Sequence, residues 1–374
     1  MKLKILFALG TRPEAIKLAP LIIKAKAEDH FKVKVCSTGQ HSEMLKQVLE
    51  FFEIQLDYDF KLMKNNQSLS VLTSDIIQKC HELFNSEYFD GVIVQGDTTT
   101  VMSVALSSFY FKIPVFHVES GLRTENKYSP FPEEMNRLLT TQLASCYFCP
   151  TKSNANNLSN EGIKKNVFVV GNTVVDALNI GLKKINQSSE IICRELLSKI
   201  DVNKKLILMT AHRRENFGKP LKTIFNTINT IANERNDVQF LYPVHLNPNV
   251  KSLAHEYLTS KNILLTRPLG YKELIYFMEK AYFIITDSGG IQEEAPSLKK
   301  PVIVLREHTE RIEGVECGNA VLVGSDLEKI NFQVKKILND SKYYNSFSAI
   351  SNPYGDGKSS QRILNHIKTF LIED

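Results

Sequence analysis

Two short segments of the chain combine glycines with residues that can bind anions. Residues 10–17 read GTRPEAIK, and residues 287–294 read DSGGIQEE. Each follows a short apolar run that we interpret as a buried parallel strand, and each begins a stretch with helical spacing. A tight turn between a strand and a helix directs backbone N–H groups outward, where they can bind a phosphate. The sequence therefore predicts two α/β domains that bind one phosphorylated or nucleotide-linked ligand.

Other polar segments also follow predicted strands, at the sheet edge where open α/β sheets bind ligands. They are residues 96–100, 119–124, 211–216 and 244–248. A single segment of this kind could be a turn or a helix cap, but several together favour a binding site. A further loop, residues 130–137, places Glu133 and Glu134 after a turn that contains two prolines.

Acidic side chains and one histidine in these segments could transfer protons. Carboxylates that share a closed site shift one another's pKa, as proton transfer near neutral pH requires. Asp97, Glu119 and Glu133 could converge with His212 from the second half of the chain. Acidic residues are also favoured in the first turn of a helix, so Glu133 and Glu134 could serve there instead. The cations next to the predicted phosphate sites are Arg12, Lys17, Arg213, Arg306 and Arg311.

Strand-like apolar runs alternate with helix-like segments along the chain, as is typical of parallel, doubly wound sheets. In the first half we predict strands at residues 4–9, 32–37, 91–95, 115–118, 146–149 and 167–170, with helices at 14–27, 41–52, 69–85 and 101–111. In the second half we predict strands at residues 205–210, 239–243, 263–265, 282–286, 301–304 and 320–323, with helices between them. The predicted fold class is α/β, with two doubly wound Rossmann-like domains.

The length of the chain, 374 residues, also favours two domains, since it exceeds one ordinary hydrophobic core. We place an N-terminal Rossmann-like domain with the candidate carboxylates at residues 1–171. A C-terminal Rossmann-like domain with the second glycine-rich segment follows at residues 172–358. Residues 359–374 contain an amphipathic helix that we expect to pack back on the N-terminal domain.

Composition and charge exclude several classes of protein. The chain is 43% hydrophobic and 23% charged, and its net charge is +5 with Lys and Arg spread along it. This mild excess fits an anionic small substrate rather than a nucleic acid. No apolar run reaches the roughly 18 residues of a membrane helix, and the N-terminus lacks the apolar core of a signal peptide. We therefore predict a cytoplasmic protein that binds neither membrane nor nucleic acid.

Three patterns that can indicate a metal or a cofactor are incomplete here. Cys146 and Cys149 form a C-x-x-C pair inside a predicted strand, and no second pair stands at zinc spacing. No G-x-G-x-x-G fingerprint occurs. Residues 355–359 resemble the end of a P-loop but lack its first glycine and a preceding strand. The sequence therefore predicts neither a metal nor a cofactor.

Taken together, the motifs resemble those of the non-hydrolysing UDP-N-acetylglucosamine 2-epimerases of bacteria. The resemblance covers the chain from residue 3 to residue 365 or so and keeps the motifs in order. The matching segments are residues 10–17, 38–41, 96–100, 117–124, 132–137, 171–178, 212–216, 243–249, 287–297 and 309–311. The resemblance implies a glycosyltransferase-B type fold with the active site in the interdomain cleft, and a homodimer.

The resemblance also implies a reaction. The family interconverts UDP-GlcNAc and UDP-ManNAc without a metal or nicotinamide, supplying ManNAc units for surface polysaccharide. The C2 proton is removed and UDP leaves by anti elimination, giving 2-acetamidoglucal; UDP then re-adds with protonation on the other face. Such a reaction needs a positioned base at C2 and cations at the diphosphate.

Residue by residue, the resemblance assigns catalysis to Asp97, Glu119, Glu133, His212, Arg12 and Lys17. It assigns the UDP-sugar site to Arg12, Pro268, Leu269, Phe277, Ser288, Gly289, Gly290, Glu294 and Arg311. Within this site, Ser288, Gly289 and Gly290 would hold the diphosphate and Glu294 the ribose hydroxyls. Pro268, Leu269 and Phe277 would frame the uracil. Which carboxylate acts on which face of C2 stays open.

An activator site for a second UDP-GlcNAc also belongs to the family. The positions that correspond to it are Gln40, His41, Glu43, Asn66, Arg213 and His245. Two of them depart from the family pattern, because Glu43 stands where Gln is usual and Asn66 where Arg is frequent. Losing a positive charge and gaining a negative one weakens the attraction for a diphosphate. We therefore predict weak activation by substrate.

Alternative functions share part of this pattern. A glycosyltransferase of the same fold would leave the carboxylates Asp97, Glu119 and Glu133 unexplained. A hydrolysing 2-epimerase would release free ManNAc, but the intact segments 10–17 and 38–41 favour the non-hydrolysing branch. A regulator that only binds nucleotide sugars would not need Asp97 or His212. An epimerase of a related UDP-sugar, such as a 2,3-diacetamido uronic acid, remains an alternative within the enzyme class.

Overall fold

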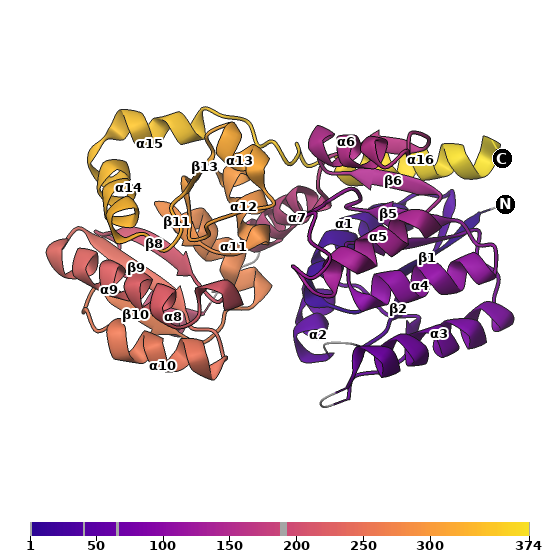
Figure 1. Ribbon diagram of the computed structural model, residues 1–374, viewed down its shortest axis with the longest axis horizontal. Helices are drawn as coiled ribbons and strands as arrows, with labels where there is room; N and C mark the ends of the chain where they lie inside the picture. The colour runs from indigo at the N-terminus through magenta and orange to yellow at the C-terminus, as the bar shows by residue number, and fades with distance from the viewer. Residues whose placement is uncertain (1, 40–41, 65–66, 188–192, 374) are drawn as a thin grey trace. The chain divides into compact units, whose positions relative to one another are not determined.

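The chain forms two compact units in the computed structural model, which describes residues 2–39, 42–64, 67–187 and 193–373. The first unit comprises Met1–Ile180 and Tyr354–Asp374, and the second comprises Gly181–Pro353. Each unit is a parallel sheet with helices on both faces (Figure 1). The predicted α/β class with two doubly wound, Rossmann-like halves is therefore confirmed. The first unit includes residues 172–180 and 354–358, which the sequence-based division assigned to the second domain.

The first unit is built on a seven-stranded sheet with the order β3-β2-β1-β4-β5-β6-β7. Its strands are β1 (Leu3–Leu9), β2 (Phe31–Ser37), β3 (Tyr58–Asp59), β4 (Gly91–Gln95), β5 (Val115–Val118), β6 (Cys146–Cys149) and β7 (Val167–Val169). Its helices are α1 (Arg12–Ala27), α2 (Ser42–Phe51), α3 (Leu69–Ser86), α4 (Thr99–Tyr110), α5 (Glu133–Leu143), α6 (Lys152–Asn160) and α16 (Ser359–Glu373), and α7 (Thr173–Gln187) begins in this unit.

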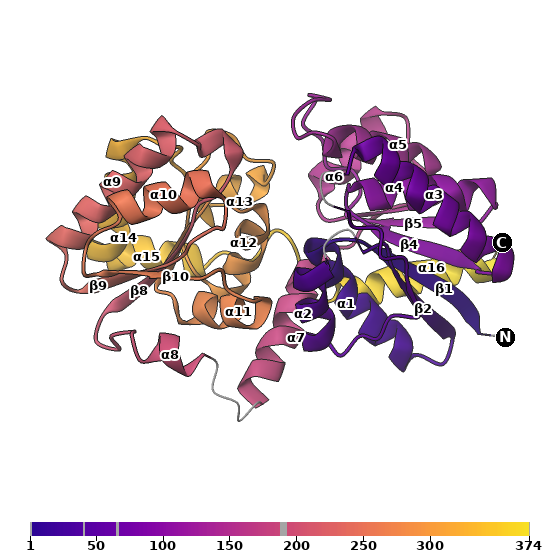
Figure 2. The same ribbon diagram turned by 90° about the horizontal axis from the view of Figure 1, so that it is seen from below.

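Helices α3, α4 and α5 lie on one face of this sheet, whereas α1 and α16 lie on the other (Figure 2). Helix α16 packs along α1, and its His366 ring stacks on Phe168 with the centroids 3.8 Å apart. Its Phe370 ring meets Phe116 of β5 edge-on at 5.6 Å. The C-terminal helix thus packs over β5, β6 and the edge strand β7 of the first sheet.

The second unit is built on a six-stranded sheet with the order β10-β9-β8-β11-β12-β13. Its strands are β8 (Lys205–Thr210), β9 (Val238–Pro243), β10 (Ile263–Thr266), β11 (Phe283–Thr286), β12 (Val302–Val304) and β13 (Ala320–Leu322). Its helices are α8 (Arg194–Leu197), η1 (Arg214–Asn216), α9 (Lys219–Glu234), α10 (Pro248–Tyr257), α11 (Tyr271–Lys280), α12 (Gly289–Glu294), η2 (Ala295–Leu298), α13 (Ile312–Glu316), α14 (Leu327–Asn339) and α15 (Ser341–Ser348).

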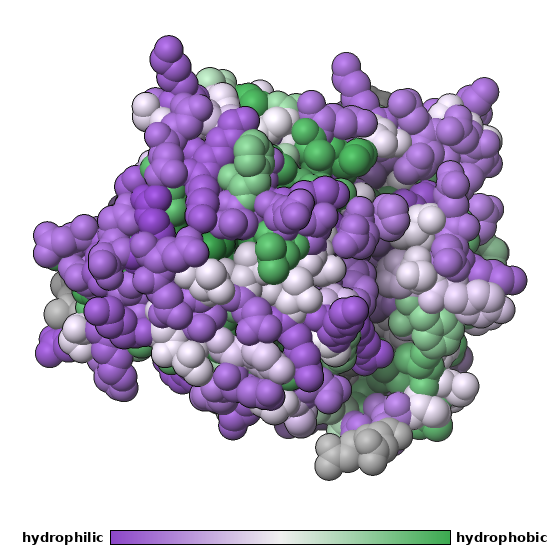
Figure 3. Space-filling model, turned by 60° about the vertical axis from the view of Figure 1, so that its left-hand side comes forward, coloured by the Kyte–Doolittle hydropathy of each residue, from purple (hydrophilic) through white to green (hydrophobic). Residues whose placement is uncertain are grey.

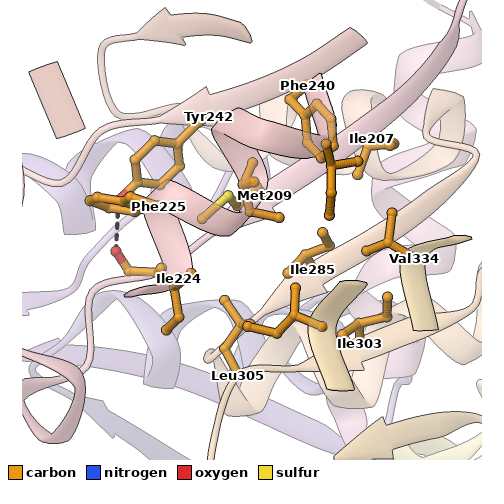
Figure 4. Packing of buried hydrophobic residues seen from close by; sticks show 14 of the residues in the cluster. Ile207, Met209, Ile224, Phe225, Phe240, Tyr242, Ile285, Ile303, Leu305 and Val334 are labelled. Carbon is orange, nitrogen blue, oxygen red and sulfur yellow. Dashed lines mark hydrogen bonds between the residues drawn. The ribbon is translucent and has the colours of Figure 1, made fainter. Parts of the chain in front are cut away.

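A dense hydrophobic core lies under α9, α10 and α14 on one face of the second sheet. Figure 4 shows side chains from β8, β9, β11 and β12 meeting Phe225 of α9 and Val334 of α14. The buried Tyr242 hydroxyl donates a hydrogen bond to the Ala211 carbonyl oxygen at 2.8 Å, just before the loop that carries His212. This core therefore fixes the end of β8 in place.

Every predicted strand is present, with ends that differ from the prediction by one residue at most. Buried parallel strands are continuous apolar runs, and this makes them recognisable in a sequence. The two-residue strand β3, at the edge of the first sheet, was missed because two residues show no periodicity.

The surface is mixed in character. On the face shown in Figure 3, hydrophilic residues predominate and the hydrophobic ones form smaller, separate areas. Among the helices that the structure describes, none has the length and the apolar character needed to cross a membrane.

Candidate active site

The loops that follow β1, β4 and β5 lie next to one another at one edge of the first sheet. These three strands are parallel neighbours in the order β1-β4-β5. Their carboxyl ends therefore meet at the same edge, which is where open α/β sheets bind ligands. The side chains of Arg12, Asp97 and Glu119 come from these three loops or the helices that they begin.

A buried carboxylate joins the first two of these loops. Glu14 lies in the first turn of α1, and its Oε2 accepts the backbone N–H groups of Gly10 at 3.0 Å and Thr11 at 2.6 Å. Its Oε1 accepts the Thr98 hydroxyl at 2.8 Å. Burial raises the pKa of Glu14 to about 6, although the hydrogen bonds oppose this shift. Glu14 thus holds the turn before Arg12 against the loop that carries Asp97.

Glu119 is held by two side chains that contact the same oxygen. Lys17 Nζ and Gln95 Nε2 each lie 2.5 Å from Glu119 Oε2. The side chains of Lys17 and Glu119 are each 9% exposed, so this ion pair is mostly shielded from water. Glu119 also has a positive φ of 63°, a conformation that costs about 1–3 kcal/mol and clusters at functional sites. The structure thus brings together Lys17 and Glu119, two of the residues predicted to be catalytic.

Asp97 belongs to a second charged group at this edge. Its Oδ2 accepts from Arg137 Nη2 at 2.7 Å and Nε at 3.1 Å, and its backbone oxygen accepts from Asn136 at 2.9 Å. Arg137 Nη1 donates to Glu134 Oε2 at 2.6 Å, and both of these side chains are almost fully buried. Arg137 of α5 therefore fixes the Asp97 carboxylate, whereas Glu134 holds Arg137 with one oxygen and accepts the Thr124 backbone N–H with the other at 3.1 Å.

Glu133 differs from its neighbour Glu134. It is the first residue of α5, and its Oε2 is buried without a hydrogen-bond partner among the described residues. A buried carboxylate oxygen without a partner carries a desolvation cost of about 1–3 kcal/mol or more. This makes Glu133 the better candidate for a group that meets a substrate.

His117 is a buried residue that supports the same edge. Burial lowers its pKa to about 4, so the ring is neutral near pH 7. Its Nε2 lies 2.8 Å from the carbonyl oxygen of Gly96, to which it donates. His117 thus steadies the residue just before Asp97.

In the second unit, the loops after β8 and β11 are joined by a different buried carboxylate. Asp287 is 0% exposed, and its Oδ2 accepts the backbone N–H groups of His212 at 2.7 Å and Arg213 at 2.8 Å. Asn216 Nδ2 is a third donor to this oxygen, at 3.3 Å. The hydroxyls of Thr210 and Thr286 also meet at 2.6 Å, at the ends of the two strands. These contacts fix the path of the loop that presents His212.

His212 lies between a carboxylate and a second histidine. Its Nδ1 is 3.5 Å from Asp287 Oδ1, and its ring stacks on His245 with the centroids 5.2 Å apart and an interplanar angle of 8°. Burial lowers the pKa of His212, Asp287 raises it, and His245 and Arg213 lower it further. The net shift is downward, so neutral His212 predominates near pH 7.

Three arginines carry the positive charge of this edge. Burial and then repulsion from Arg306 and Arg311 lower the pKa of Arg213, whereas Asp287 and Glu310 oppose this shift, so the guanidinium groups of Arg306 and Arg311 both lie near that of Arg213. Arg306 pairs with Glu215 at 2.7 Å, and its buried Nη1 has no hydrogen-bond partner among the described residues. An anion bound here would relieve the repulsion and occupy that donor.

Arg311 also lies against the start of α12. A Cβ added to Gly289 would stand 3.0 Å from Arg311 Cζ, so glycine allows the guanidinium to approach the helix. Arg311 is held by Glu293 at 3.0 Å and by Glu310 at 2.5 Å. Ser288 is the N-cap residue of α12, and Gly290 follows Gly289 in its first turn. Arg311 thus lies beside the residues predicted to bind the diphosphate, Ser288, Gly289 and Gly290.

The residues predicted to bind the nucleoside have varied surroundings. Glu294 is buried and accepts the Tyr271 hydroxyl at 3.2 Å. Pro268 is exposed, Leu269 is buried, and the Phe277 ring is 0% exposed within α11. Phe277 therefore presents no surface to a ligand in this conformation, and its role as a direct uracil contact stays a prediction.

Only part of the predicted activator site falls on described residues. Gln40, His41 and Asn66 lie outside the described ranges, and Glu43 is described only as a backbone position in α2. Arg213 and His245 lie together with His212, as reported above. In the described part of the chain, no group of three or more His, Cys, Asp or Glu side chains could hold a metal ion.

Several residues that organise the site were not singled out as candidates from the sequence. They are Glu14, Gln95, Arg137, Asp287 and Glu293. All of them stand inside or next to the motifs, so their position near the candidate site could be predicted from the sequence. Their partners lie far away in the chain, and for this reason no local pattern indicates which groups they hold.

Comparison with known proteins places the chain among epimerases. The family model described as UDP-N-acetylglucosamine 2-epimerase matches residues 23–368. The UDP-N-acetylglucosamine 2-epimerase of Salmonella borreze is 48% identical over 97% of this chain and 97% of its own length. The crystal structure of UDP-GlcNAc 2-epimerase from Neisseria meningitidis bound to UDP-GlcNAc has a TM-score of 0.90 and 44% identity, over 98% of this chain and 100% of that one. The UDP-GlcNAc 2-epimerase of Methanocaldococcus jannaschii in complex with UDP-GlcNAc and UDP has a TM-score of 0.81 and 35% identity, over 99% of this chain and 100% of that one.

Replacing Arg137 by alanine tests the charged group around Asp97. The variant leaves the buried Glu134 carboxylate without its cation, so we expect the free energy of unfolding to fall by about 3–5 kcal/mol. Lys79→Ala is the control in the same unit, because Lys79 forms an exposed ion pair with Glu82 on α3. Its loss should be about 1 kcal/mol or less. Both are measured by denaturant unfolding, and equal losses would contradict the role given to Arg137.

Proposed function

Because the chain belongs to the UDP-N-acetylglucosamine 2-epimerase family, we propose that it catalyses the reversible C2 epimerisation of UDP-GlcNAc to UDP-ManNAc. The similarity to the Neisseria meningitidis epimerase, which was solved with UDP-GlcNAc bound, supports this substrate. The observation that carries the proposal is the Glu119 carboxylate, held by Lys17 and Gln95 at the sheet edge where Asp97 also lies. A non-acidic C2 proton needs a positioned carboxylate of this kind.

The proposed reaction has two steps that mirror each other. A base takes the C2 proton, the C–H electron pair forms the C1–C2 double bond, and the C1–O bond breaks with its electrons leaving on UDP. The intermediate is 2-acetamidoglucal. UDP then adds back to C1 while an acid delivers a proton to the opposite face of C2, which inverts that centre.

We assign the proton transfers to Asp97, Glu119, Glu133 and His212. Arg137 fixes the Asp97 carboxylate, and Lys17 fixes that of Glu119, so both are held in place before substrate arrives. Such preorganisation avoids rearrangement during the reaction. The buried Oε2 of Glu133, which has no hydrogen-bond partner among the described residues, supports its contact with substrate. Arg12, at the start of α1, completes the set by adding positive charge at the same edge.

We assign the binding of UDP to the second unit. Gly289 and Gly290 offer N–H groups in the first turn of α12, Ser288 adds its hydroxyl at the N-cap, and Arg311 adds a guanidinium beside Gly289. Negative charge develops on UDP as the C1–O bond breaks, so donors and cations placed here lower the barrier. Pro268, Leu269 and Phe277 for the uracil and Glu294 for the ribose complete the proposal. We also propose that the protein is a homodimer that works in the cytoplasm and serves surface polysaccharide synthesis.

Turnover in D2O tests the elimination step. Since the C2 proton is removed and a solvent-derived proton is returned, we expect deuterium at C2 of the UDP-sugar pool, without added metal or NAD. The measurement is proton NMR or mass spectrometry of the recovered UDP-sugars, with a sample lacking enzyme as the control. Epimerisation without deuterium at C2 would rule out proton abstraction there.

Single substitutions test the assigned groups. Asp97→Asn, Glu119→Gln, Glu133→Gln and His212→Asn each remove an acid/base group, which typically costs about 10²–10⁴-fold in rate. We expect at least a 10²-fold or so loss of kcat in each, with binding of UDP retained. Glu82→Gln and His255→Asn are controls at exposed positions on α3 and α10. Near wild-type kcat for all four site variants would place the chemistry elsewhere.

The departures at Glu43 and Asn66 lead to a prediction about activation. A charged hydrogen bond contributes about 1.5–3 kcal/mol, so losing one should weaken activator binding roughly tenfold or more. We expect turnover of UDP-ManNAc to show little lag and little stimulation by trace UDP-GlcNAc. Progress curves with Asn66→Arg as the comparison variant are the measurement. A long lag in the natural protein, abolished by UDP-GlcNAc, would show a working activator site.

A further inference from the structure

We infer that Asp287 is a positioning residue that sets the tautomer of His212, keeping the proton of the neutral ring on Nδ1 and the lone pair on Nε2. The use of this tautomer in catalysis rests on the proposed function. The geometry itself involves only residues of the second unit.

One oxygen of Asp287 is fully used in holding the loop. Oδ2 accepts the N–H groups of His212 and Arg213 and the amide of Asn216. These donors fix the orientation of the carboxylate, because two of them are backbone groups that cannot rotate away. Asp287 also lies at 0% exposure, so water does not compete for it.

The other oxygen of Asp287 is left for the imidazole ring. Oδ1 is buried and has no hydrogen-bond partner among the described residues, and His212 Nδ1 lies 3.5 Å away. Catalytic hydrogen bonds are often long before substrate binds and tighten in the complex. An ionised carboxylate only accepts hydrogen bonds. The ring nitrogen that faces it must therefore carry the proton.

His245 provides an internal contrast to His212. The two rings are stacked at 5.2 Å, which restrains the plane of each. The Nδ1 of His245, however, accepts the backbone N–H of Asn247 at 3.1 Å. A neutral His245 must therefore carry its proton on Nε2. The structure thus predicts opposite tautomers in two neighbouring histidines.

The chemical consequence concerns Nε2 of His212. Burial lowers the pKa of this histidine, Asp287 opposes the shift, and His245 and Arg213 add to it, so the net shift is downward and the neutral ring is the resting form. With its proton on Nδ1, the ring can accept a proton or a hydrogen bond at Nε2 and return it in the reverse step. The wrong tautomer could only donate there.

The test is the position of the imidazole protons in the intact protein. We would label histidine with ¹⁵N and record long-range ¹⁵N–¹H spectra at a pH of about 8, where imidazole is neutral. His212→Asn and His245→Asn assign the two ring systems among the nine histidines. We expect the Nδ1–H tautomer at His212 and the Nε2–H tautomer at His245. A proton on Nε2 of His212 in the natural protein would overturn the inference, and this result needs no Asp287 variant.

Asp287→Asn then tests the cause. The asparagine oxygen can take over the backbone N–H groups, which turns its NH₂ toward His212 Nδ1 and forces the proton to Nε2. We expect the His212 tautomer to invert while that of His245 stays unchanged. Asp340→Asn, which alters the N-cap of α15, is the matched control and should move neither ring. An unchanged His212 tautomer in Asp287→Asn would overturn the inference.

The activity of Asp287→Asn is a separate test of the positioning role. The corresponding change in Ser-His-Asp enzymes costs about 10⁴-fold through the wrong tautomer, so we expect exchange of the C2 proton in Asp287→Asn to fall by about 10²–10⁴-fold. Inversion of the tautomer with an unchanged exchange rate would contradict the positioning role. If the tautomers are as expected but the natural protein exchanges no C2 proton, the proposed reaction fails and the tautomer assignment stands.

Discussion

In each unit, one buried carboxylate holds two active-site loops together, and the rest of the site depends on it. Glu14 accepts N–H groups from the loop after β1 and a hydroxyl from the loop after β4. Asp287, after β11, accepts N–H groups from the loop after β8. Backbone N–H groups at the ends of strands have no partner in the sheet, and a buried one without a partner is costly. The same contacts that satisfy them bring residues from distant parts of the chain to fixed positions.

Charged side chains near these two buried carboxylates hold the proposed reactive groups in place. Lys17 and Arg137 hold the carboxylates of Glu119 and Asp97 within the first unit. In the second unit, Arg306 and Arg311 repel the partly buried Arg213. Arginines kept close together at such a cost favour an anion, and a diphosphate would supply two or more negative charges. These contacts support the proposed division, in which the first unit supplies the carboxylates for proton transfer and the second supplies His212 and the groups that bind UDP.

The features that could be predicted from the sequence are those whose pattern lies within one short segment of the chain. The strands and their polar ends were predictable, because a buried parallel strand is a continuous apolar run and ligands bind at its carboxyl end. Glu14 could be placed in a helix start, but its bond to Thr98 joins residues 84 positions apart. Arg137 and Asp97 are 40 positions apart. Such pairings follow from sheet order, which periodicity does not reveal. The split roles of Glu133 and Glu134 likewise emerged only from their contacts.

The most direct test of the account is the fate of UDP-GlcNAc incubated with the purified protein, followed at C2 by proton NMR. The account predicts that signals of UDP-ManNAc grow until both UDP-sugars are present at equilibrium, and that starting from UDP-ManNAc gives the same mixture. Release of free ManNAc with UDP would indicate a hydrolysing enzyme instead. UDP-GlcNAc that stays unchanged under conditions where the protein binds it would contradict the central claim.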